Sequence, residues 1–179
     1  MQKAILLLGL ACVTAAAADA PALTGLDLIQ ARYAGMWHVV EVGYDTDFSR
    51  AGTKEYDITR DCAPTGAVLD CKLMAKGALQ GEQRFAWDAA ADLYHVDMDI
   101  AGHPQPQLAL SVRDAAWTFQ QSVPGPDGKP MQLRIQRQYR SLAEVSYSVS
   151  YSRDGGAHWT LMSKGTEVKT DAAASKPAS

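Results

Sequence analysis

The residues best suited to metal or acid–base chemistry stand together on one short segment. His95, Asp97 and Asp99 alternate with apolar residues, so on a β-strand an imidazole and two carboxylates would share one face. Those groups could hold a divalent cation. Turning that face toward the core, however, would leave the alternating apolar side chains as an exposed stripe. We therefore expect a solvated acidic face with no metal bound.

Signatures of other catalytic sites are missing from the sequence. There is no G-x-S-x-G, no H-E-x-x-H and no phosphate loop. Serines alternate at positions 146, 148 and 150, but a nucleophile needs a positioned base, and the sequence indicates none. The four histidines, at positions 38, 95, 103 and 158, are scattered, which argues against haem ligation. We expect no cofactor.

Composition places the chain among ordinary folded proteins. Its 179 residues are 47% hydrophobic and 21% charged, which suits one domain with a core. Seventeen basic residues against 20 acidic ones give a net charge of −3, and no run of Lys or Arg occurs. A surface that neutralises phosphates is therefore not expected, so nucleic acid is not an expected partner.

The N-terminal segment has the layout of a secretory signal peptide. A positive charge at Lys3 precedes a ten-residue apolar run over 4–13, and small residues follow. That run is too short to span a bilayer. We expect cleavage after Ala18 and a periplasmic or secreted protein, because lipidation at Cys12 would follow a short apolar run and a poorly suited Leu10. The expected division is a signal peptide over 1–18, a single β-barrel domain over 19–169 and a disordered tail over 170–179.

Export leaves two cysteines, an even number in an oxidising compartment. Pro64 and Gly66 supply turn chemistry between Cys62 and Cys71, so a hairpin could bring the two sulfur atoms into bridging range. Neither a C-x-x-C pattern nor a nearby His favours a redox or metal role. We predict a structural disulfide, worth roughly 3 kcal/mol for a loop of about ten residues.

The elements that position these side chains are read from hydrophobic periodicity. A short helix is expected over Gly25–Ala34, where apolar residues are spaced for one face. Alternation with period two then continues, with turn residues at each boundary. The predicted strands are Trp37–Tyr44, Thr53–Arg60, Ala67–Ala75, Leu79–Trp87, Leu93–Ile100, Gln107–Val112, Ala116–Ser122, Met131–Tyr139, Glu144–Tyr151 and His158–Lys169.

The connections between these strands are short, and none could hold the helical crossover that a parallel sheet needs. A dry and a wet face on the same strand, clearest over Glu144–Tyr151, is typical of a barrel or a sandwich. We predict an all-β fold: an antiparallel up-and-down barrel of about ten strands with a short N-terminal helix, because closure removes the sheet edges. A β-sandwich is the alternative.

Gly35-Met36-Trp37 opens the first strand directly after the predicted helix. This triplet resembles the G-x-W signature of lipocalins and the wider calycin barrels. In that superfamily the Trp plugs the closed end of the barrel, and a basic residue from a late strand packs across it. The resemblance implies a calycin-like barrel in which Gly35 and Trp37 are structural positions.

The segment from Ser152 to Trp159 fits S-x-D-x-G-x-x-W. It is similar to the Asp-box, which occurs on hairpin turns of many secreted β proteins, sialidases among them. The resemblance implies that oxygens of Ser152 and Asp154 accept hydrogen bonds from turn amides, that Gly156 takes a positive φ and that Trp159 folds back on the turn. One copy implies a rigid hairpin without sialidase chemistry. The chain is also similar to uncharacterised secreted bacterial proteins of this size.

A barrel that starts at Trp37 would gather its longer, Pro- and Gly-rich turns at the opposite end, as expected at the mouth of a ligand barrel. Inward-facing residues would either line a cavity or fill a solid core, and both outcomes stay open. The candidate ligand-binding residues are Val96, Met98, Leu108, Leu110, Phe119, Leu133, Arg137, Tyr139, Tyr147 and Val149.

Arg137 is the polar residue of greatest interest in that set. It continues the parity of Leu133 and Ile135, so it should point inward beside Tyr139. Arg-x-Tyr inside a barrel is similar to the carboxylate clamp of fatty-acid-binding proteins, where a guanidinium and a phenol hold the acid. The strand runs toward the Trp37 end, however, so we favour packing of Arg137 or Tyr139 on Trp37 over ligand anchoring.

The sequence thus favours an exported, non-catalytic barrel that binds a small apolar or amphipathic molecule. The second hypothesis is a protein-interaction module of the cell envelope, with a filled core and a partner protein at its mouth loops or at the 152–159 hairpin. The third is an enzyme that acts through the acidic strand face or the mouth. An interior cavity would favour the first hypothesis, and a solid core with an apolar loop patch the second.

Overall fold

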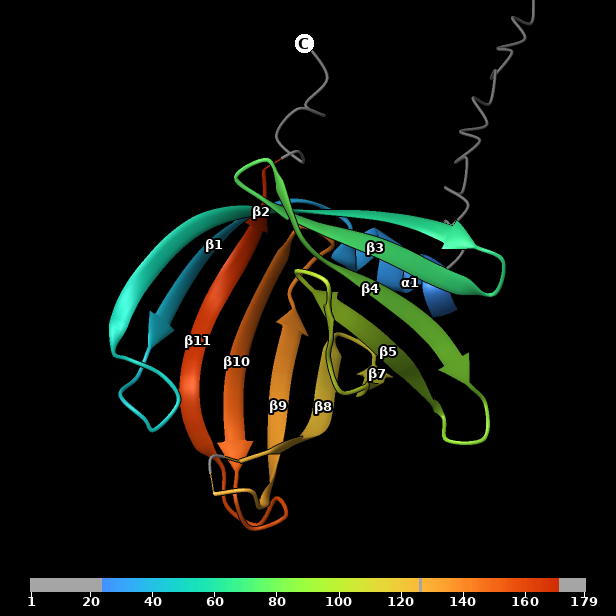
Figure 1. Cartoon of the computed structure of the whole chain (residues 1–179). Coiled ribbons are helices and arrows are strands. Elements are labelled where there is room, and N and C mark those ends of the chain that lie inside the picture. The colour runs from blue at the N-terminus through green and yellow to red at the C-terminus, as the bar shows by residue number, and fades with distance from the viewer. Residues whose placement is uncertain (1–23, 126, 171–179) are drawn as a thin grey trace, which may run out of the picture.

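The computed structural model describes residues 24–125 and 127–170, which form a closed β-barrel (Figure 1). One short helix, α1 (Gly25–Tyr33), precedes the antiparallel strands. The ten strands of the barrel are β1 (Gly35–Gly43), β2 (Gly52–Thr65), β3 (Val68–Ala75), β4 (Ala78–Asp88), β5 (Leu93–Ile100), β7 (Leu108–Arg113), β8 (Ala116–Pro124), β9 (Pro130–Tyr139), β10 (Glu144–Ser152) and β11 (Thr160–Lys169). A two-residue strand, β6 (His103–Pro104), pairs with the end of β5.

Each barrel strand pairs with its neighbours along the chain, and β1 pairs with β11 to close the circle. The closing register runs from Trp37 opposite Lys169 to Gly43 opposite Ser163. The predicted all-β up-and-down barrel is therefore confirmed, and the sandwich alternative is wrong. Closure gives the first and last strands partners on both sides, which removes the edges that an open sheet would expose.

Most element boundaries lie within two residues of those that the alternation predicts. The largest difference is β2, which continues five residues past Arg60 to Thr65. Its last residues pair with β3 as far as Thr65 opposite Val68, and Gly66 turns the chain with a φ of 63°. Acidic and turn-forming residues over 61–65 concealed this extension from the sequence pattern. The predicted signal peptide and the segment 171–179 lie outside the described residues.

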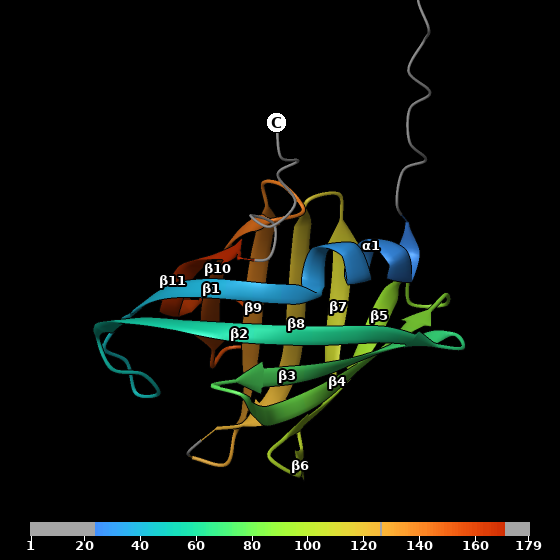
Figure 2. The ribbon, with the colours of Figure 1, turned by 90° about the horizontal axis from the view of Figure 1, so that it is seen from above.

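Helix α1 covers one end of the barrel, which we call the closed end (Figure 2). Three side-chain donors fix it to three different parts of the wall. Gln30 donates to the Cys62 carbonyl of β2 at 3.0 Å, Lys169 of β11 donates to the Ala31 carbonyl at 2.8 Å, and Arg32 donates to the carbonyl of Asp114 between β7 and β8. Ile29 of α1 is fully buried in the core beneath it. Within the described residues, no helix is long and apolar enough to cross a membrane.

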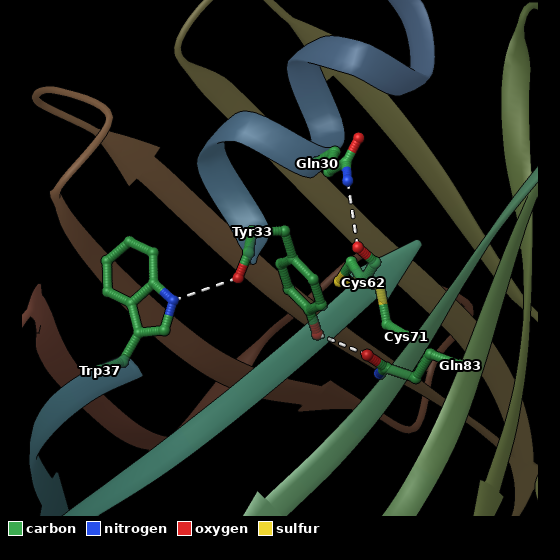
Figure 3. The surroundings of a disulfide bond; sticks show 6 residues. All are labelled: Gln30, Tyr33, Trp37, Cys62, Cys71 and Gln83. Atoms are coloured by element: carbon green, nitrogen blue, oxygen red, sulfur yellow. Dashed lines mark hydrogen bonds between the residues drawn. A yellow bond between two sulfur atoms is a disulfide. The ribbon is translucent and has the colours of Figure 1, made fainter. Parts of the chain in front are cut away.

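The predicted disulfide between Cys62 and Cys71 is confirmed, and it lies under α1 (Figure 3). The two cysteines are direct partners in the β2–β3 ladder, with Cα atoms 4.0 Å apart. Beside the bridge, Tyr33 of α1 donates its hydroxyl to Gln83 Oε1 at 2.6 Å, and the indole of Trp37 donates to the Tyr33 carbonyl at 3.1 Å. The bridge and these bonds join the helix to the first four strands.

Candidate functional site

An ionic cluster lies inside the closed end of the barrel. The carboxylate of Glu167 on β11 accepts hydrogen bonds from both terminal nitrogens of Arg60 on β2, at 2.8 and 3.0 Å. Arg137 of β9 donates to the same carboxylate. All three side chains are buried. Burial alone would raise the pKa of Glu167, but Arg137 and Arg60 outweigh it and lower that pKa to about 2.

Arg137 points inward, as its parity predicts, and the carboxylate that it holds is that of Glu167. Its guanidinium lies 5.4 Å from the Tyr33 ring centroid and 5.7 Å from that of Tyr139. The predicted packing of Arg137 or Tyr139 on Trp37 is therefore wrong: Tyr139 packs on Trp117, with ring centroids 4.5 Å apart. The cations over Trp37 are Arg60, at 5.7 Å, and Lys169, at 5.1 Å. Sequence reasoning missed Arg60 and Glu167. The alternation of Tyr56, Ile58 and Arg60 is the signal that could have placed Arg60 on the inner face.

The ten candidate ligand-binding residues all lie on the inner face of the barrel, and they divide into two groups by burial. The buried group, toward the closed end and the β5–β8 wall, comprises Val96, Leu108, Leu110, Phe119, Arg137 and Tyr139. The half-buried group comprises Met98, Leu133, Tyr147 and Val149. Ile135, between Leu133 and Arg137 on β9, is also half-buried. Met98 lies beside Gln83, which contacts Tyr33 of α1, and Ile135 packs against the buried core. The half-buried residues nearest the mouth are Leu133 and Val149.

The turns at the end away from α1 form the mouth of the barrel. A pocket of about 650 Å³ opens there beneath the loop 44–51, which joins β1 to β2. We call it the mouth pocket. Its lining includes Glu41, Phe48, Lys54, Val149, Met162 and Ser163. Glu41, Val149 and Ser163 occupy inward-facing positions, so the pocket reaches the inner face at the rim of the barrel, whereas Leu133 and Ile135 do not line it.

The loop 44–51 is fixed to the hairpin between β10 and β11. The ring of Phe48 packs edge-on against Tyr151, with centroids 4.7 Å apart. Arg153 pairs with Asp47 at 2.7 Å, and its guanidinium lies 5.3 Å from the Phe48 ring centroid. The pocket therefore has a wall made by packing between two segments about 100 residues apart in the chain.

A second polar set lies on the inner face between the ionic cluster and the mouth pocket. Tyr56 of β2 donates its hydroxyl to Glu41 Oε2 at 3.1 Å. Burial, followed by the nearby Glu41 carboxylate, raises the pKa of Tyr56. Burial also raises the pKa of Tyr147, with Tyr56 and Glu41 adding to the effect. Both phenols are thus neutral hydrogen-bonding groups at neutral pH.

Gly165 of β11 allows the Tyr147 ring to approach the wall. A Cβ built at Gly165 would come within 2.8 Å of that ring and within 2.5 Å of the Val40 carbonyl oxygen. Any other residue would therefore displace the ring or the backbone. The Tyr147 ring therefore occupies the space that a side chain at position 165 would fill.

The turn from Ser152 to Trp159 is held by its own hydrogen bonds. Ser152 Oγ accepts the Gly156 amide at 2.9 Å, and Asp154 Oδ1 accepts the His158 amide at 2.9 Å. The Trp159 indole donates to the Gly156 carbonyl at 2.9 Å. Gly156 has a φ of 98°. Hydrogen bonds from His158 and Ser152 lower the pKa of Asp154, so these local bonds favour its charged form.

The acidic strand face lies on the outside of the barrel, because Val96 and Met98 face inward. His95 contacts Asp88 at 3.0 Å, and Asp97 accepts a hydrogen bond from Gln107 at 2.7 Å. Over 24–125 and 127–170, no group of three His, Cys, Asp or Glu side chains is arranged to hold a metal ion. The inner face at the mouth remains the strongest candidate site.

Fold and site together define a closed ten-stranded antiparallel barrel with an ionic cluster under its helix and a pocket at its mouth. No family model matches the chain, and no curated protein matches it. Eleven chains of solved structures match, including a redesigned β-barrel with 14% sequence identity and a TM-score of 0.35. That comparison covers 79% of this chain and 94% of the designed one. At that TM-score the likeness carries no argument about function.

Proposed function

We propose that the protein binds a small apolar or amphipathic molecule in the mouth half of the barrel. The observation that carries the proposal is the half-buried state of Leu133, Ile135 and Val149, all on the inner face. Apolar surface left in contact with water costs roughly 25 cal/mol per Å². A guest that covers these side chains, entering through the mouth pocket, would therefore be stabilised.

We also propose that the barrel is calycin-like and that the protein is exported. The closed-end Trp37 is fully buried, and Lys169 of the last strand lies over its ring. Both features agree with the G-x-W resemblance. The Cys62–Cys71 disulfide supports an oxidising compartment, in agreement with the signal-like N-terminal segment.

Binding of N-phenyl-1-naphthylamine, an uncharged probe that fluoresces in apolar surroundings, tests the proposed ligand site. We expect saturable binding to the wild-type protein. Val149→Trp should weaken it about tenfold or more, because the added indole would occupy the space that one ligand ring needs. The matched control is Val168→Trp, which adds the same volume at an exposed position on the outer face of β11. That variant should bind as the wild type does.

Thermal unfolding of each variant checks that the barrel stays folded, and Leu133→Trp repeats the test from β9 if Val149→Trp unfolds. Equal binding by the folded Val149→Trp and Leu133→Trp variants would contradict the site. If the wild-type protein shows no saturable binding, the proposal fails and the interaction module, acting through its mouth loops, becomes the better hypothesis.

A further inference from the structure

The two carboxylates on the inner face of the barrel have different surroundings. Glu167 is buried and accepts hydrogen bonds from two guanidinium groups. Glu41 lies two residues beyond Val39 on β1, is half-buried and borders the mouth pocket. Within the described part of the chain it forms no ion pair, and its side-chain hydrogen bond comes from the neutral phenol of Tyr56. Glu41 thus brings a negative charge to the pocket wall.

Two cations, Lys54 and Arg50, line the mouth pocket together with Glu41. Lys54 stands opposite Glu41 in the β1–β2 register, but its side chain is exposed, as is that of Arg50. Arg153 pairs with Asp47 at the rim. Solvent screens charges at such exposed positions, whereas a half-buried carboxylate acts through a medium of lower dielectric constant. Glu41 is therefore the least screened of these charges.

The two guanidinium groups deeper in the barrel already bind a carboxylate through their terminal nitrogens, while their Nε atoms have no hydrogen-bond partner within the described residues. Arg137 and Arg60 already share Glu167, and displacing that carboxylate would leave a buried charge without its partners. In the ionic cluster, Glu167 thus takes the place beside Arg137 that the carboxylate of a bound fatty acid would need.

We infer that the preferred ligand is a cationic amphipathic molecule, with an ammonium group beside Glu41 and an apolar chain against Val149, Ile135 and Leu133. The inference rests on the proposed function and adds the charge of the ligand. The carboxylate supplies the counter-charge and an acceptor, and the Tyr56 hydroxyl holds it in place. The apolar chain covers the half-buried side chains that line the mouth half.

The contribution of the head-group charge to affinity is distinguished from that of the apolar chain with three molecules of ten carbons: decylamine, 1-decanol and decanoate. Each is measured at pH 7 by displacement of N-phenyl-1-naphthylamine or by calorimetry. We expect decylamine to bind about tenfold more tightly than decanoate, because a half-buried carboxylate favours one sign of charge. Glu41→Gln should weaken decylamine binding about tenfold and leave 1-decanol binding unchanged.

The matched control is Glu82→Gln, which removes the same charge from an exposed residue of β4 and should change none of the three affinities. If 1-decanol binds but decylamine binds no more tightly than decanoate, the inference fails while the proposed function stands. If decylamine binds tightly to both the wild type and Glu41→Gln, the assignment of Glu41 is wrong. If none of the three binds, the proposed function itself fails.

Discussion

Glu167 shows how a charged residue is kept inside this barrel. Its carboxylate accepts two hydrogen bonds from the Arg60 guanidinium and one from Arg137, so this buried charge has two positively charged partners. Breaking a buried pair by removing one partner costs far more than the pair itself contributes, since the remaining charge stays in a medium of low dielectric constant. The cluster therefore holds β2, β9 and β11 in one arrangement under the helix.

Glu167→Gln should destabilise the protein by about 3–5 kcal/mol at pH 7, because both guanidinium groups lose their counter-charge. The pKa of Glu167 is lowered from 4.5 to about 2 in the folded protein. Its stabilising contribution is thus fully present above pH 4.5 and is lost as the pH falls through 2. We expect the wild type to lose about 3 kcal/mol more than the variant over this interval.

Urea unfolding of both proteins at pH 7, 4.5 and 2.5 measures the difference directly. Glu144→Gln, at an exposed ion pair with Arg140, is the control and should parallel the wild type. Free energies of unfolding that fall in parallel for the wild type and Glu167→Gln would show that the cluster does not hold a charged Glu167.

At the scale of elements, the β2–β3 hairpin carries the cross-link of the fold. Cys62 and Cys71 are nine residues apart and directly paired, and Gln30 of α1 bonds the Cys62 carbonyl. The disulfide therefore restricts the unfolded chain and also supports the segment on which the helix rests.

Replacing both cysteines by alanine should lower the free energy of unfolding by about 2–3 kcal/mol, the range for closing a short loop. Reduction of the wild type should have a similar effect, and a reductant should leave the double variant unchanged. Denaturant unfolding with and without reductant measures both. A wild-type midpoint that does not move on reduction would mean that the hairpin is equally stable without the bridge.

The elements also show what the sequence could predict. Strict alternation, as in Glu144–Tyr151, predicts a strand and its inner face because side chains in a sheet repeat every two residues. It placed Arg137 inward correctly. It could not pair Arg60 with Glu167, because the two are 107 residues apart and meet only after β1 and β11 close the barrel. The sequence pattern also could not predict the mouth pocket, because the wall of this pocket depends on how the loop 44–51 packs against the β10–β11 hairpin.

At the scale of the whole molecule, the barrel has two unlike halves. Under α1, large side chains such as Trp37, Phe85 and Trp117 are fully buried and pack in one hydrophobic core. Toward the mouth, the Tyr147 ring lies against Gly165, and Leu133 and Val149 are half-buried, although Met131 and Tyr151 are buried there. The hydrophobic core under α1 stabilises the fold, so the mouth half can leave space for a ligand.

The most direct test of this division is methyl NMR with 1-decanol, which has no charge and so probes the cavity alone. We expect shifts at methyl groups of the mouth half, Leu133, Ile135 and Val149, while Leu110 and Val145 in the closed half stay unchanged. Shifts confined to exposed outer residues such as Leu142 and Val168, or no shifts at saturating alcohol, would contradict a ligand site inside the mouth.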